Sequence, residues 1–285
     1  MRTSAIIIGA LSAAAYAKPV AQNGRWTPEW QNLNAEVSAG PSASAVPTPA
    51  SSASVLGVPG ASPNPTPNSK LVADLLTAPA GSDRITLLQD AEKNGIADFK
   101  ARRSSIVFDL NPAANNVTAG AGGVVITADR KRFPALTTLD VAVAGLFYQP
   151  CGLNPPHAHR ATEVLTVATE GTLLTGFVFD NTASTEISEE ISQFQSFAFP
   201  EGSMHWQQNQ ECHPVTAIAA FSNEDPGAIT TANRFFKNTK QDVVLAALGF
   251  PEQITPENFE QFKNQIPDPF VKGIKQCYDK CGIPY

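Results

Sequence analysis

The sequence predicts a mainly all-β protein, an antiparallel sandwich or barrel with flanking N-terminal helices and a small C-terminal helical extension. Between Ile106 and Phe221 the chain consists of short apolar or alternating runs separated by Gly, Pro, Asn and Asp. Such a texture is typical of folds built from many short strands. The runs are SIVFDL, GGVVITA, LDVAVAGLFY, EVLTVAT, TLLTGFVF, FQSFAF and VTAIAAF. The 285 residues, 42% of them hydrophobic, suffice for one good core.

The N-terminal part is predicted to be a secretion signal followed by a spacer. Residues 1–17 have a charged start at Arg2, an apolar run and a small-residue end at Ala17, as in a cleaved signal peptide. Residues 18–68 form a spacer rich in Ser, Ala and Pro, which buries too little apolar surface to order. Its Ser, Thr and Pro content is about equally consistent with O-glycosylation and with a simple distance-keeping role, and such a spacer favours attachment to a cell wall or display on a surface.

Three further segments complete the predicted organisation. Residues 69–102 hold two short amphipathic helices, SKLVADLLTA and SDRITLLQDAEK, expected to pack outside the β domain. Residues 103–236 form the β domain, which contains one N-glycosylation acceptor, Asn116. Residues 237–285 form three helices, TKQDVVLAALGF, TPENFEQFKNQI and DPFVKGIKQCYDK, the second capped by Thr255. Their exposed phenylalanines either pack on the barrel or make a homo-oligomer contact; these are Phe259, Phe262 and Phe270.

Charge and hydropathy exclude two classes of partner. The formal net charge is −6, and no cluster of Lys and Arg offers a stripe that could follow phosphates, so nucleic acid is not an expected partner. Beyond the signal no apolar run approaches the ~20 residues that span a bilayer, so we expect no membrane insertion. A secreted protein with a small-molecule ligand or substrate fits this composition.

The clearest functional signal is a concentration of histidines. The chain has only four, and two of them, His157 and His159, are one residue apart with Glu163 close behind. Residues i and i+2 of a strand face the same side, so both imidazoles can point into a barrel. A later turn with Pro200 and Gly202 leads to His205 on another strand. Three imidazoles and one carboxylate are a donor set for a divalent metal that leaves two octahedral positions open, as a catalytic metal requires.

Two stretches of the chain resemble the germin and spherulin branch of the cupin family. They are NPPHAHRATE followed by GTLLTGF, and FPEGSMHWQQN followed by AFSNEDPG. The resemblance implies a jelly-roll β-barrel, secretion, oligomers assembled partly through C-terminal helices, and a metal that is usually manganese. It also implies His157, His159, Glu163 and His205 as the ligands, with Asn154 near the open positions. Iron, zinc, nickel and copper suit the same donors.

Four positions depart from the family pattern. Cys151 and Phe194 stand where the two motifs usually have glycine, and Glu163 falls one residue early. Oxalate-oxidising germins resemble one another in a second asparagine, and here Ala144 occupies its place. The resemblance to an oxalate site is therefore weaker than the resemblance to a metal site.

The four cysteines can form two disulfides in a secreted chain. If the strands of His157 and His205 pair antiparallel, Cys151 and Cys212 fall close to the same register. This register predicts a Cys151–Cys212 disulfide and leaves Cys277–Cys281 to close a short turn. His213, next to Cys212, is expected to be a surface or loop histidine because the site already has four donors.

Three functions remain open at this point. The first is an extracellular manganese oxidoreductase that acts on superoxide or on a small carboxylate. The second is a structural, storage or stress protein in which the barrel and its metal provide stability. The third is a module that binds sugars or small acids in the same cavity.

Overall fold

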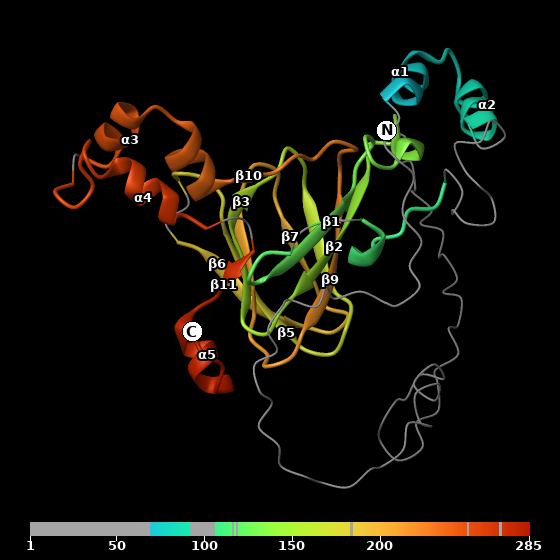
Figure 1. Cartoon of the computed structure of the whole chain (residues 1–285). Coiled ribbons are helices and arrows are strands. Elements are labelled where there is room, and N and C mark those ends of the chain that lie inside the picture. The colour runs from blue at the N-terminus through green and yellow to red at the C-terminus, as the bar shows by residue number, and fades with distance from the viewer. Residues whose placement is uncertain are drawn as a thin grey trace, which may run out of the picture. The chain divides into compact units, whose positions relative to one another are not determined.

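A computed structural model describes residues 69–91, 106–115, 117, 119–182, 185–249, 251–267 and 270–285 (Figure 1). All of them belong to one compact unit, Ser51–Tyr285. The predicted signal peptide, the predicted spacer and the predicted glycan acceptor Asn116 lie outside the described residues. Among the described helices none has the length and apolarity that crossing a membrane requires.

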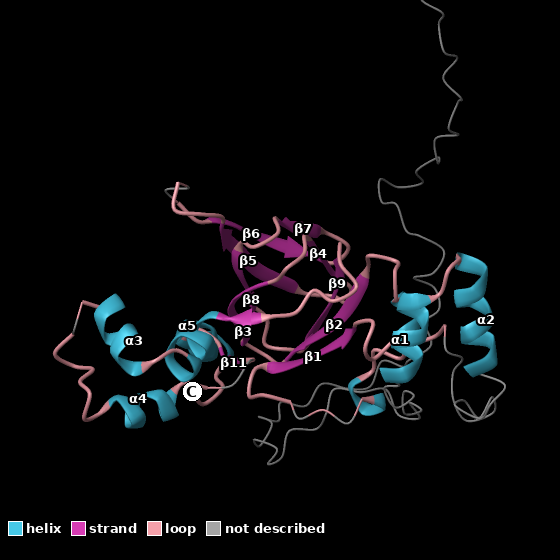
Figure 2. Cartoon of the chain, turned by 90° about the horizontal axis from the view of Figure 1, so that it is seen from above, coloured by secondary structure: helices cyan, strands magenta, loops and turns pink. Residues whose placement is uncertain are grey.

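The β domain consists of two antiparallel sheets (Figures 1 and 2). The five-stranded sheet has the order β1 (Gly123–Ala128), β2 (Ala142–Tyr148), β9 (Val215–Phe221), β4 (Glu163–Val167) and β7 (Ser196–Phe199). The second sheet has the order β10 (Ile229–Thr230), β3 (Gly152–Ala158), β8 (Met204–Asn209), β5 (Thr172–Val178) and β6 (Ile187–Ser192), and β11 (Val271–Lys272) also pairs with β3. The mainly antiparallel β prediction is confirmed, with the strand crossovers of a jelly roll.

The main core lies between the two sheets and follows from strand alternation. In β2 and β9 every second residue is buried, as expected for strands with one face toward a core. The buried faces carry Ala142, Ala144, Leu146 and Tyr148 on β2, and Val215, Ala217, Ala219 and Phe221 on β9. Leu165 and Phe199 from the neighbouring strands close the cluster. Several of these side chains are alanines, which leaves room between the sheets for a site.

Two runs differ from the strand prediction. The apolar run at residues 106–110 forms no strand, because it leads into a turn in which Asn111 caps the 3₁₀ helix η3 (Pro112–Ala114). Conversely, the polar segment Ile187–Ser192 forms edge strand β6, with Ile191 its buried residue. An edge strand with a solvated face needs little apolar patterning, so its sequence resembles a loop.

The helices flank the sheets. Helices α1 (Ser69–Thr77) and α2 (Gly81–Ala91) pack together through Leu71, Leu75 and Leu88, and against Ala135 of η4 (Pro134–Leu136). At the other end of the chain come the π-helical turn η5 (Asn233–Lys237), α3 (Gln241–Ala247), α4 (Phe259–Gln265) and α5 (Lys275–Cys281). Phe259 is buried against Val244 and Leu245 of α3, so the chain itself covers this aromatic residue.

Two helix boundaries in the C-terminal extension differ from the prediction. Helix α4 begins at Phe259 and not after Thr255: the residues between Thr255 and Phe259 form turns, and Phe262 N donates to Asn258 O at 3.0 Å at the start of the helix. The expected third helix is shorter, since Val271 and Lys272 add to β3 as strand β11. Gly273 then turns the chain, with its amide donating to Cys151 O at 2.9 Å.

The disulfides are Cys151–Cys277 and Cys212–Cys281, so the predicted pairing of Cys151 with Cys212 and of Cys277 with Cys281 is wrong. The predicted strand register holds at His157, which pairs with His205, but it shifts by one residue between Asn154 and His157. Moreover, Cys212 lies beyond Asn209, the end of β8. Helix α5 occupies the place between the two strand ends, and both bridges fasten it to the barrel.

Candidate metal centre

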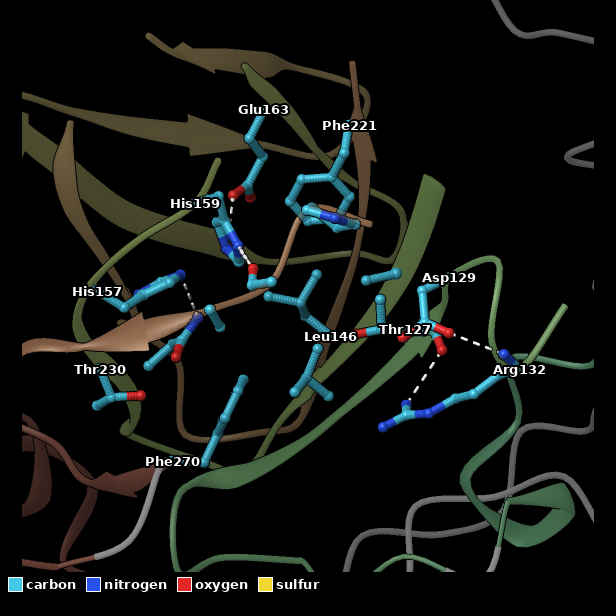
Figure 3. Close-up of a pocket in the computed structure, with 16 residues that line it drawn as sticks. Thr127, Asp129, Arg132, Leu146, His157, His159, Glu163, Phe221, Thr230 and Phe270 are labelled. Carbon is cyan, nitrogen blue, oxygen red and sulfur yellow. Dashed lines mark hydrogen bonds and ion pairs between the residues drawn. The ribbon is translucent and has the colours of Figure 1, made fainter. Parts of the chain in front are cut away.

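Four side chains, three on strands and one just after a strand, converge on one point inside the barrel (Figure 3). They are His157, His159, Glu163 and His205, the residues predicted as ligands, and their donor atoms all lie within 4.8 Å of one another. Glu163 Oε2 is 3.0 Å from His205 Nε2 and 3.5 Å from His159 Nε2. All four predicted donors are thus brought together. His213, by contrast, is exposed in a loop, as expected.

Strand pairing and a bulge explain the convergence. His157 on β3 lies directly opposite His205 on β8. The register shift at Pro155 and Pro156 turns β3, so that His159 follows just after the strand and faces the same interior. Glu163 begins β4 in the opposite sheet, and the turn at Gly202, which has φ +77°, returns the chain into β8. The carboxylate therefore approaches the imidazoles from across the barrel.

Each imidazole is oriented by a backbone carbonyl. His157 Nδ1 donates to Pro155 O at 2.8 Å, His205 Nδ1 donates to Ser203 O at 2.9 Å, and His159 Nδ1 donates to Gly227 O. A neutral imidazole that carries its proton on Nδ1 presents a lone pair on Nε2. All three Nε2 lone pairs can thus point toward the carboxylate oxygen of Glu163. Orientation of ligating histidines by such carbonyls is typical of metal sites.

Burial keeps two of these histidines neutral. It lowers the pKa of His157 well below its usual value, and the neighbouring His205 and His159 lower it further. Burial also lowers the pKa of His159, although the Glu163 carboxylate and the Gly227 carbonyl act in the opposite direction. Near neutral pH both rings are therefore free of the second proton that would block Nε2.

Aromatic rings hold the imidazoles in place. Phe199 stacks on His205 with ring centroids 4.3 Å apart and an interplanar angle of 22°. Phe221 meets His159 edge to face at 4.9 Å. His205 is 1% exposed, so its ring has no room to rotate. The site is pre-organised on rigid strands by packing as well as by hydrogen bonds.

The donor set fits a divalent cation. Metal–nitrogen and metal–oxygen bonds of about 2.1 Å place neighbouring donors about 3 Å apart and opposite donors about 4 Å apart. The distances of 3.0 and 3.5 Å from Glu163 Oε2 fall in this range. Three lone pairs and a carboxylate that face one another in a buried space repel unless a positive charge lies between them. These residues could therefore hold a metal.

Comparisons with known proteins agree with this site. The Cupin family profile matches residues 108–255, more than half of the chain. The chain belongs to the cupin family.

Spherulin-1A of Physarum polycephalum is 35% identical over 222 residues, which cover 78% of this chain and 82% of the relative. Germin-like protein 8-10 of Oryza sativa subsp. japonica is 46% identical over 152 residues, covering 52% and 64% of the two chains. A solved oxalate oxidase in complex with glycolate has a TM-score of 0.50 and 25% identity, covering 59% of this chain and 84% of that one.

Two departures of this cupin from its relatives' motifs have a structural consequence. Cys151 and Phe194, which replace the usual glycines, have φ angles of +56° and +62°. These angles lie in the left-handed region, which glycine enters without steric cost and other residues enter with strain. Both positions therefore have a backbone conformation that favours glycine, although neither residue is glycine.

Asn154 of the cupin site belongs to a buried network that sequence reasoning found only in part. Asn154 Nδ2 donates to Gln207 Oε1 at 2.8 Å and lies 3.5 Å from His157 Nε2. The Tyr148 hydroxyl donates to the same Gln207 oxygen at 3.3 Å. Burial, and next the negative charge of Glu163, raise the pKa of Tyr148 well above its usual value, so it remains a donor. Gln207 could have been found from strand alternation, since it lies two residues after His205 on the same face.

The cupin centre opens into a cavity of about 300 Å³. Ala144 lines the cavity, as do Asn154 and three of the four candidate ligands. The cavity is also lined by Phe270, which is only 2% exposed and packs on the barrel, one of the two roles expected for it. Strand β11 places this ring against Tyr148, with centroids 5.2 Å apart.

Proposed function

We propose that this cupin is a secreted metal-dependent oxidoreductase of the germin-like kind, with manganese held by His157, His159, Glu163 and His205. One observation carries the proposal: three oriented imidazole lone pairs and one buried carboxylate face a common point that opens into a cavity. Secretion is supported by the two disulfides, which persist in oxidising compartments. Manganese is supported by the resemblance to germins, since the donors themselves also suit iron, zinc, nickel or copper.

The chain's own residues would perform three tasks. His157, His159, Glu163 and His205 hold the metal, which supplies a redox couple and open positions for superoxide, dioxygen or a small carboxylate. Asn154 turns its amide toward the same space, where it can donate a hydrogen bond to a bound oxygen atom. The apolar walls around Phe221 and Phe270 exclude bulk water, which strengthens these polar contacts.

A non-catalytic role is the second candidate, either as a structural, storage or stress protein or as a module that binds sugars or small acids. It is supported by the similarity to Spherulin-1A and by Ala144, which provides no amide where oxalate-oxidising germins have one. In that case the bound metal would only stabilise the folded barrel and would take part in no reaction. Attachment to a cell wall and a homo-oligomer formed through α3 and α4 fit either candidate and are part of the proposal.

Metal analysis and redox assays of the same protein test the proposal. Protein purified without added metal should contain about one transition-metal ion per chain. When loaded with manganese it should dismutate superoxide or consume oxygen with a small carboxylate. His157→Ala should lose both metal and activity because it removes a donor, whereas His213→Ala, an exposed histidine, should retain both.

The outcomes separate the candidates. Full metal content in His157→Ala would contradict the ligand set. Metal-loaded protein that is inactive toward both substrate types would contradict the oxidoreductase and leave the structural or binding role.

A further inference from the structure

The cavity continues well beyond the metal centre and changes character along its length. Its inner end is polar, with Asn154 and the candidate ligands. Its middle is apolar, lined by Leu146, Phe221 and Phe270 (Figure 3). Its outer end is polar again, where Thr127, Asp129 and Arg132 lie on the side of the cavity away from the histidines (Figure 3).

Strand register explains the apolar middle. Val125 of β1 pairs with Leu146 of β2, and Thr127 pairs with Ala144. Directly paired residues point to the same face of a sheet, so these side chains form two adjacent rows on the inner face. Leu146 and Ala144 are buried, while Val125 is 37% exposed at the cavity's edge. The floor between the two polar ends is therefore continuous apolar surface.

A two-carbon diacid does not match this cavity. A volume of about 300 Å³ lies at the lower end of the range of about 300–1,000 Å³ found for pockets that bind drug-sized molecules. An acid of oxalate size at the metal would leave most of this volume to water against apolar walls. A ligand with an apolar body would displace that water and bury its own surface, which is favourable.

The outer end offers partners for a second polar group. Asp129 Oδ1 accepts from Arg132 N at 2.8 Å, and Arg132 Nη1 donates to Thr127 O at 3.1 Å. These bonds fix a carboxylate and a guanidinium at the mouth. A hydroxyl that reaches this place can donate to the carboxylate of Asp129.

We propose that the cavity takes an aromatic carboxylic acid with a hydroxyl at its far end. The acid's carboxylate lies at the metal and Asn154, its ring lies between Leu146, Phe221 and Phe270, and its hydroxyl meets Asp129. This assignment names the ligand class of the same site and rests on the proposed function for the inner end only. The middle and the outer end of the cavity are lined by residues that do not contact the metal, so this part of the assignment does not depend on metal binding.

Calorimetry on manganese-loaded protein with three ligands tests the assignment. Para-hydroxycinnamate should bind about tenfold more tightly than oxalate, because the ring buries apolar surface that oxalate lacks. Cinnamate, which has no hydroxyl, should fall between the two. Equal or tighter binding of oxalate would overturn the assignment, as would binding of none of the three to metal-loaded protein.

A variant at the cavity's edge locates the ring. Val125→Gln replaces a half-exposed apolar side chain, so folding should be unaffected, and it should weaken para-hydroxycinnamate about fourfold while leaving oxalate unchanged. Val164→Gln is the matched control: Val164 is also a strand valine, 41% exposed, and does not line the cavity. Equal effects of the two variants on para-hydroxycinnamate would contradict the assignment.

Metal content, measured on the same samples, separates this assignment from the proposed function. Protein that holds no metal but binds para-hydroxycinnamate in a Val125-dependent way would support the ligand class and contradict the metal-dependent function. Protein that holds metal but prefers oxalate would contradict the ligand class alone.

Discussion

Cys151 and Cys281 belong to different disulfides, and yet their sulfur atoms lie 3.7 Å apart. The two disulfides join the start of β3 and the loop after β8 to helix α5. Both strands carry candidate ligands, and the segment before α5 carries Phe270, which lines the cavity. The C-terminal helix is therefore covalently connected to both motifs of the site.

This proximity predicts disulfide exchange in a single variant. In Cys212→Ser the Cys281 thiol loses its partner, and its thiolate can attack Cys151 Sγ and release Cys277 as the new thiolate. Non-reducing peptide mapping should therefore find two isomers, Cys151–Cys277 and Cys151–Cys281. Detection of Cys151–Cys277 alone after prolonged incubation at alkaline pH would show that the sulfurs do not meet in solution.

Phe194 predicts a stabilising substitution. Phe194 has a φ of +62°, a conformation that destabilises any residue with a side chain by about 1 kcal/mol relative to glycine. The phenyl ring is exposed. Phe194→Gly should therefore raise the free energy of unfolding by about 0.5–1 kcal/mol in urea denaturation. Phe179→Gly, at an exposed phenylalanine with negative φ, should lower it. The same sign for both variants would contradict the strain argument.

Metal binding should raise the melting temperature. A ligand present at about a hundred times its Kd stabilises the folded state by about 2.7 kcal/mol, which corresponds to several degrees for a domain of this size. Differential scanning fluorimetry with manganese and then with a chelator should show this shift. His205→Ala should abolish the shift and His213→Ala should keep it, while a shift that survives in His205→Ala would place the metal elsewhere.

The candidate ligands could be predicted from the sequence because each rests on local chemistry. His157 and His159 are two residues apart, the spacing at which side chains of a strand face the same side. The Pro200 and Gly202 turn indicates that a new strand follows, and His205 lies on it. The disulfide pairing could not be predicted, since it depends on a one-residue register shift at Pro155 and Pro156 and on where α5 docks. Both are outcomes of tertiary packing, and sequence spacing does not encode them.

Two element predictions failed for physical reasons: the start of helix α4, predicted from a helix cap, and strand β6, which hydrophobic patterning did not reveal. Thr255 and Asn258 have the spacing of a capping box, and Asn258 Oδ1 does accept from Thr255 N, but the residues between them form turns and the helical bonding of α4 starts later, with Phe262 N donating to Asn258 O. Strand β6 has one buried residue, so the signal that identifies strands is nearly absent. Gln207, which accepts a hydrogen bond from Asn154, could have been predicted from the alternation of side chains along the strand of His205, but it belongs to no distinctive motif.

The loop that orients His159 provides a test at a distance from the ligands. Gly227 O accepts from His159 Nδ1, and Glu224, three residues earlier, is buried and bonded to Arg130 Nη1 at 3.0 Å and to Asp140 N at 3.3 Å. Glu224→Ala should free this loop and with it the orientation of His159. Loss of such outer contacts typically weakens metal binding by about 10–100-fold.

A competition titration against a chelating dye measures this change in metal affinity. Glu260→Ala, which removes an exposed carboxylate paired with Lys263, is the matched control and should leave the affinity unchanged. Glu224→Ala should also lower the free energy of unfolding by about 1–2 kcal/mol, because the Asp140 amide loses its acceptor and the part-exposed Arg130 guanidinium keeps only Asp225 as a carboxylate partner. Loss of stability with unchanged metal affinity would mean that Gly227 holds its place without Glu224, and that the barrel alone orients His159.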